Sequence, residues 1–249
     1  SYGIEPLPDI DFNIRAGNTL VGFGTKAELD KGLTYTLDGL EMKAVIEEQC
    51  EVVDRAFERY KQIQLNEGED YATFHAAKAE LLERLKDLRE ELDSYLGKQY
   101  GKDQDHSAKQ FAAWKKSHQP FHWFAEYYGI VEKRGGFDVI IGNPPYLEVR
   151  QIGYEPKGLS TLESNAVHSM CIERSAQVLN AAHGSMSMIV PLSIVCTQRM
   201  IGTQAIIENG RTTWYSNFAW RPGKLFDAVN RALTIYVARA NAAPSTYST

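Results

Sequence analysis

The sequence contains no long hydrophobic run. Its longest nearly uninterrupted apolar stretch, residues 186–196, is far shorter than the ~20 residues that a membrane-spanning helix needs. No charged segment followed by an apolar one opens the chain, so no secretory signal is visible. Both absences argue against a membrane helix and predict that the partners do not include a membrane.

Cysteine is scarce as well. The three cysteines, Cys50, Cys171 and Cys196, are too scattered for a metal-binding knuckle or a redox pair. His118 and His122 stand four residues apart without a carboxylate pattern nearby, so we interpret them as surface and packing histidines. The sequence therefore predicts no metal site, and the cysteine usage fits a reduced, cytoplasmic compartment.

Strong positive charge is also missing. The 249 residues are 43% hydrophobic and 24% charged, values of an ordinary globular protein, with a net charge of −5. Residues 1–130 carry 16 basic against 24 acidic side chains, and residues 131–249 carry 11 against 8. Any nucleic-acid contact should therefore come from the second part, although its small positive balance is weak support.

The first half of the chain predicts helices. Residues 1–25 are rich in turns, and Leu20, Val21 and Phe23 are typical of a short strand. Residues 38–65 and 70–97 both repeat apolar side chains at three- and four-residue steps. The two patterns follow each other closely, which indicates an antiparallel helical hairpin.

The second half, from about residue 130, alternates strand and helix signals. A helix is predicted near residues 170–179, and strands at 137–141, 184–191, 213–220 and 233–238. Alternation of this kind favours an α/β fold with a mostly parallel sheet.

The most specific feature is the strand 137–141, predicted to be buried, which runs through Gly142 into Asn143, Pro144, Pro145 and Tyr146. Open α/β sheets bind ligands at the carboxyl ends of their strands. The two prolines have no N–H group, so this loop presents hydrogen-bond acceptors and suits a substrate that offers N–H groups. Tyr146 adds a flat ring on which a base could stack. The structural alternative is a strand that simply ends at prolines.

Four segments together resemble a known family, the adenine-N6 DNA methyltransferases that depend on S-adenosylmethionine. More narrowly, they resemble the large methylases of type IIG restriction-modification and phage-exclusion systems. The resemblance covers nearly the whole chain and is carried by the Asn-Pro-Pro-Tyr motif and by residues 6–22, 121–126, 184–193 and 221–235.

The resemblance implies a role for each motif residue. Asn143 and Pro144 would accept the two hydrogens of the target adenine amine, and Pro145 would hold the loop rigid. Tyr146 and Phe226 would stack on the flipped adenine, with Phe218 as the competing aromatic. Asn18, with Asn143, would contact the cofactor S-adenosylmethionine, although Asn18 also fits a plain turn. The implied fold is a partial Rossmann-like methyltransferase sheet with the helical hairpin inserted.

The sequence departs from the family in one respect. The glycine-rich motif that cradles the cofactor is not found, and residues 22–24 come too late to replace it. The order of the segments predicts that this motif lies upstream and that a target-recognition domain lies downstream. We therefore expect the catalytic part of a larger polypeptide that acts on double-stranded DNA. Its predicted parts are a core segment 1–25, a hairpin insertion 26–120 and a catalytic core 121–249.

Two other functions remain open at this point. Asn-Pro-Pro-Tyr also serves methyltransferases that act on side-chain amides, so protein glutamine methylation is an alternative, which the hairpin and the 225–235 region argue against. The chain could also be an inactive scaffold without its cofactor loop. Binding of S-adenosylmethionine would separate that scaffold from the two enzymes.

Overall fold

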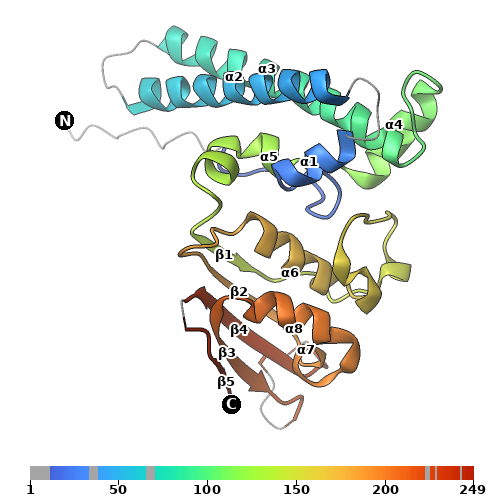
Figure 1. Cartoon of the computed structure of the whole chain (residues 1–249), viewed down its shortest axis with the longest axis vertical. Helices are drawn as coiled ribbons and strands as arrows, with labels where there is room; N and C mark the ends of the chain where they lie inside the picture. Colours follow the sequence, from blue (N-terminus) through green and yellow to red (C-terminus); the bar gives the residue numbers. More distant parts are fainter. Residues whose placement is uncertain (1–11, 34–38, 66–70, 222–224, 228, 242) are drawn as a thin grey trace.

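The computed structural model describes residues 12–33, 39–65, 71–221, 225–227, 229–241 and 243–249. Residues 6–11 and 222–224, which carry part of the family resemblance, lie outside this description. The helical part of the chain is stacked on a sheet part, drawn in blue and green above yellow and red in Figure 1.

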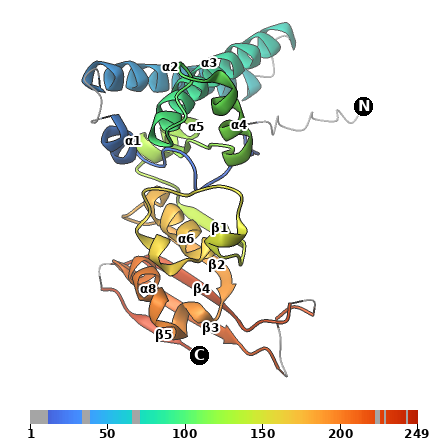
Figure 2. The ribbon, with the colours of Figure 1, turned by 90° about the vertical axis from the view of Figure 1, so that its right-hand side faces the viewer.

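The predicted hairpin is confirmed. Helix α2 spans Gly39–Leu65 and α3 spans Tyr71–Gln99, within two residues of the predicted limits. The two helices lie side by side in both views (Figures 1 and 2) and bury one apolar stripe each between them and the helices beneath. The stripe includes Ile46, Leu81, Leu85, Leu88 and Leu92, all at most 1% exposed. The three- and four-residue spacing puts these side chains on one helix face, which is why the pattern was readable.

Three shorter helices connect the hairpin to the rest of the chain. They are α1 (Lys26–Leu33), α4 (Ala108–His118) and α5 (Trp123–Glu126), followed by a π-helical turn, η1 (Gly129–Lys133). Ser107 caps α4 by accepting a hydrogen bond from the Gln110 amide at 3.4 Å. The domain limits proposed at residues 25 and 120 stay a prediction.

The strand predicted at residues 20–23 is wrong. Leu20, Val21 and Phe23 are buried, but their backbone forms turns, and only an isolated bridge joins Asn18 to Pro120. Gly22 has a φ of 139°, which interrupts an extended strand. Apolar residues between glycines therefore indicated burial correctly and secondary structure incorrectly.

The sheet has five strands in the order β1-β2-β4-β3-β5. Their bounds are β1 Val139–Gly142, β2 Ser185–Pro191, β3 Arg211–Phe218, β4 Leu233–Ala240 and β5 Thr246–Ser248. The predicted α/β class is confirmed, but the sheet is mixed: β1 and β2 are parallel, as are β3 and β5, whereas β4 is antiparallel to both β2 and β3. No helix is described between β3 and β4, and antiparallel neighbours need no crossover helix.

Helices cover one face of the sheet. Helix α6 (Val167–Val178), α7 (Ser193–Cys196) and α8 (Ile201–Glu208) lie on that face, to the left of the strands in Figure 2. Three single 3-10 turns complete the described helices: η2 (Val149–Gln151), η3 (Ser160–Ser164) and η4 (Gln198–Met200). Within the described ranges, no helix is both long and apolar enough to cross a membrane.

Strand β1 was predicted to be buried, and this is wrong. It is an edge strand that pairs with β2 on one side, and its Val139 and Ile141 side chains are 60% and 79% exposed. Both side chains point away from the helix-covered face, because Ile140 between them packs against the core and neighbours alternate along a strand. An apolar run alone does not tell an edge strand from a central one.

Candidate functional site

The predicted motif lies where the sheet is expected to bind ligands. Strand β1 ends at Gly142, which is in register with Met188 of β2, and Asn143 follows directly. The Asn143 side chain is exposed, Pro144 is buried, Pro145 is exposed and Tyr146 is half-buried. The structure thus presents the amide of Asn143 to solvent at the carboxyl end of a parallel strand.

Tyr146 bonds to the motif itself. Its Oη lies 2.9 Å from Oδ1 of Asn143 and 3.0 Å from the carbonyl oxygen of Ile189 in β2. Since a hydroxyl has one hydrogen, it donates to one of these acceptors at a time. Burial raises the pKa of Tyr146, so the hydroxyl keeps its proton at neutral pH. The amide oxygen of Asn143 can therefore either accept the Tyr146 hydroxyl or be free to accept another donor, without any change in the backbone.

Phe226 is the second aromatic residue that the resemblance places on the flipped adenine. Phe226 is 42% exposed, and no ring contact joins it to Tyr146 in the part of the chain that the structure describes. Phe218 ends β3, where it is half-buried opposite Leu233. The roles of Phe226 and Phe218 in stacking on the adenine, and the choice between them, stay a prediction.

Asn18 lies in a turn beside α6. Its Oδ1 accepts a hydrogen bond from the Leu20 amide at 3.1 Å, its backbone N–H donates to Gln119, and its side chain also bonds to Tyr154. Leu20 packs in one cluster with Val167 and Met170 of α6. This is the geometry of the plain turn that the sequence also allowed.

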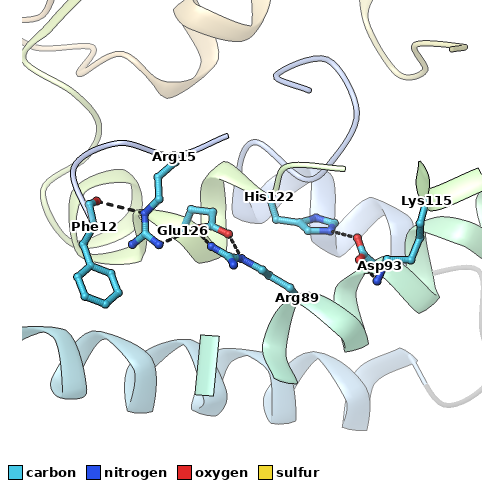
Figure 3. Close-up of polar contacts among 7 residues, drawn as sticks. All are labelled: Phe12, Arg15, Arg89, Asp93, Lys115, His122 and Glu126. Atoms are coloured by element: carbon cyan, nitrogen blue, oxygen red, sulfur yellow. Dashed lines mark hydrogen bonds and ion pairs between the residues drawn. The ribbon is translucent and has the colours of Figure 1, made fainter. Parts of the chain in front are cut away.

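A second polar cluster joins the hairpin to the segment 121–126, as Figure 3 shows. The Glu126 carboxylate, 3% exposed, pairs with Arg89 of α3 and lies 3.4 Å from Arg15. Asp93 of α3 pairs with Lys115 at 2.7 Å and with Nε2 of His122 at 3.1 Å.

This second cluster is structural. Nδ1 of His122 accepts the Phe23 amide at 3.2 Å, so its Nε2 carries the proton that is donated to Asp93. His122 is 1% exposed, which confirms its interpretation as a packing histidine. These charged groups have partners within the cluster, which ties α3 to α5. In the described residues no group of three or more potential ligands could hold a metal ion.

A cavity of about 610 Å³ adjoins the motif, and sequence reasoning missed it. Its lining includes Tyr146, Glu148, His168, Arg199 and Arg231. His168 lies in the first turn of α6, 4% exposed, with its ring edge-to-face against Tyr146 at 6.5 Å. Burial, with the charges of Arg199 and Arg231, lowers the pKa of His168 to about 4. No local sequence signal unites these residues, because they come from four separate segments.

Comparison with known proteins gives a family match. A family model described as Eco57I restriction-modification methylase matches residues 44–220, which contain most of the hairpin and the whole motif. The chain is also 29% identical over 175 residues to a protein of Methanocaldococcus jannaschii named as a type II restriction enzyme and methyltransferase. That match covers 56% of this chain and only 15% of the length of that curated relative.

Several solved structures are weakly similar. They include a DrdV–DNA complex (14% identity, TM-score 0.37, 47% of this chain and 15% of that chain), a type I restriction-modification system (13%, 0.34, 45% and 24%), and a nuclease-deletion mutant of the type ISP enzyme LlaGI with a DNA substrate mimic (11%, 0.36, 54% and 17%). TM-scores of this size carry no functional argument.

Proposed function

Because this chain belongs to the Eco57I restriction-modification methylase family, we propose that it forms the catalytic part of a DNA methyltransferase in a restriction-modification system. One observation carries the proposal. Residues 143–146 lie within the family match and follow directly on the carboxyl end of β1, at the edge where α/β sheets bind ligands.

In the proposed reaction the exocyclic N6 amine of an adenine attacks the methyl group of the donor. The new N–C bond forms as the S–C bond of the donor breaks, the donor leaves as a neutral thioether, and one amine proton is released to solvent. This amine is a poor nucleophile because its lone pair is delocalised into the ring. Oδ1 of Asn143 and the carbonyl oxygen of Pro144 would accept its two hydrogens, which favours a pyramidal nitrogen with its lone pair directed at the methyl group. Such an interaction is stronger in the transition state than in the ground state and so raises kcat.

The target adenine has to leave the duplex, which costs a few kcal/mol. The Tyr146 ring would recover part of this cost by stacking, about 1–3 kcal/mol for each base. For Asn143 to accept the amine, the Tyr146 hydroxyl has to donate to the Ile189 carbonyl, which already lies 3.0 Å away. This switch needs only a rotation of the hydroxyl hydrogen.

S-adenosylmethionine is the proposed methyl donor, and when bound it supplies an electrophilic methyl group on a sulfonium. Asn18 remains a proposed contact for it: Oδ1 already accepts a hydrogen bond from the Leu20 amide at 3.1 Å, but an amide oxygen can accept two hydrogen bonds and the amide nitrogen can donate two. The turn can therefore stay closed when the cofactor binds. The residues proposed for the chemistry itself are Asn143 and Pro144, on the target side.

The test is transfer of a radiolabelled methyl group to duplex DNA by the complete protein, with nucleoside analysis of the product. Asn143→Ala should lower kcat by at least about a hundredfold, as the loss of one group that stabilises a transition state does elsewhere. Asn209→Ala is the matched control, because Asn209 is also exposed but lies just before β3, at the opposite end of the sheet.

Near-normal turnover of Asn143→Ala would overturn the assignment. Label at cytosine would refute N6 of adenine as the target, and label found only in a glutamine-containing protein substrate would support the amide alternative. Asn143→Ala should lower kcat far more than it weakens binding of S-adenosylmethionine in calorimetry, because the main role proposed for the residue is at the target amine.

A further inference from the structure

The cavity beside Tyr146 carries a positive charge that the proposed methyl transfer does not use. We call it the arginine pocket, after the arginines Arg150, Arg199 and Arg231 in its lining. Glu148 is the one carboxylate of the lining, 2.8 Å from Arg150 and 3.7 Å from Arg199. With three arginines and one glutamate, the lining keeps two positive charges in excess.

Arg231 is the arginine with spare capacity. It donates to the carbonyl oxygen of Tyr146 at 3.3 Å, and no ion pair to a described carboxylate accompanies this bond. A guanidinium has five N–H donors arranged to bind planar or tetrahedral anions in pairs of hydrogen bonds. Its exposed position leaves most of these donors available to a ligand.

His168 is an independent sign that the pocket receives a polar ligand. Only 4% of this residue is exposed, and neither ring nitrogen has a hydrogen-bond partner among the residues described. Buried polar groups are normally paired, since an unpaired one loses its hydration without compensation. A ligand in the pocket would supply the missing partner, because the neutral imidazole offers one N–H donor and one acceptor.

We propose that the arginine pocket binds a phosphate group of the DNA strand, next to the nucleotide whose base stacks on Tyr146. The inference rests on the proposed function, because only that function says that the bound phosphate belongs to a DNA strand. An excess of positive charge suits a phosphodiester, whereas a base or a protein amide alone would not require it. The volume of about 610 Å³ falls within the usual range for a ligand site and has room for a phosphate with its sugar.

The test is binding of a fluorescein-labelled single-stranded octadeoxyadenylate by the full chain, followed by anisotropy at several salt concentrations. Arg231→Gln and Arg199→Gln should each weaken binding by about tenfold, the usual effect of losing a hydrogen bond to a charged group. Each should also reduce the salt slope by about 0.7. Arg239→Gln is the matched control, because Arg239 is exposed near the far end of β4 and loses the same charge.

Two further arms identify the ligand. The same oligomer with uncharged methylphosphonate linkages should bind wild type and Arg231→Gln equally. Inorganic phosphate should shift the His168 ring signals in NMR only at concentrations far above those at which the oligomer shifts them. If inorganic phosphate shifted these signals at lower concentrations than the oligomer, the pocket would be a site for free phosphate, and the assignment to a DNA strand would be wrong.

The proposed phosphate site is refuted if Arg231→Gln and Arg199→Gln bind the charged oligomer as tightly as Arg239→Gln does. His168→Leu should weaken oligomer binding while its thermal unfolding temperature stays at or above that of wild type, which a purely structural histidine would not do. If the arginine variants bind like the control while the protein still transfers methyl groups, the phosphate site is wrong and the proposed function stands. If binding depends on the arginines but no methyl group is transferred, the proposed function is wrong and the phosphate site stands.

Discussion

Replacement of Glu126 by glutamine should measure how firmly the hairpin is attached to the rest of the chain. The Glu126 carboxylate is 3% exposed and forms ion pairs with Arg15, 9% exposed, and Arg89, 39% exposed (Figure 3). Burial lowers the pKa of Arg15, and the Glu126 carboxylate opposes that change. Without Glu126 the Arg15 guanidinium would be a buried charge with no carboxylate beside it.

The expected cost follows from these exposures. Removal of one partner of a buried ion pair typically costs 3–5 kcal/mol. The lower end, about 3 kcal/mol, applies here because Gln retains an acceptor oxygen and because Arg89 can turn to water. For a chain of this length each kcal/mol lowers Tm by about 2–4 °C, so Tm should fall by roughly 6–12 °C.

Urea unfolding followed by circular dichroism, together with thermal scans, measures this change. The matched control is Glu80→Gln in helix α3, where an exposed pair with Arg84 should contribute at most about 0.5 kcal/mol. The reasoning is refuted if Glu126→Gln loses less than about 1 kcal/mol, or if Glu80→Gln loses as much.

Three further predictions concern the sheet and the motif. Tyr146→Phe should bind a mismatched target adenine nearly as well as wild type, and Tyr146→Ala should lose about 1–3 kcal/mol; equal losses in duplex-binding assays would contradict stacking. His168 has a pKa of about 4 in the folded chain and about 6.5 in the unfolded chain, so between these pH values only the unfolded chain binds the extra proton. As the pH falls through this range, wild type should therefore lose up to ~3 kcal/mol more stability than His168→Leu in urea titrations. Parallel stability profiles of the two proteins would show that His168 titrates normally. Ile141→Lys should reduce concentration-dependent association in analytical ultracentrifugation, because Ile141 is 79% exposed on an edge strand; unchanged association would exclude this edge as the contact.

Much of the chain could be predicted from local pattern. The hairpin helices were readable because helix formation and the burial of one face both depend on residues three and four apart. The strand before Asn143 was readable because a short apolar run ends at two prolines, which cannot continue a sheet ladder. The resulting motif is contiguous in sequence, so no tertiary contact was needed to find it.

Tertiary structure alone decided the remaining features. The place of β1 at the sheet edge, and the exposure of Val139 and Ile141, depend on which strands pair, and apolar residues alone do not encode pairing. The arginine pocket arises because the loop after β1, the start of α6, the η4 turn and the residues before β4 meet at one end of the sheet. Arg231 and Tyr146, which are joined by a hydrogen bond in this pocket, are 85 positions apart, and such a separation is beyond any local periodicity.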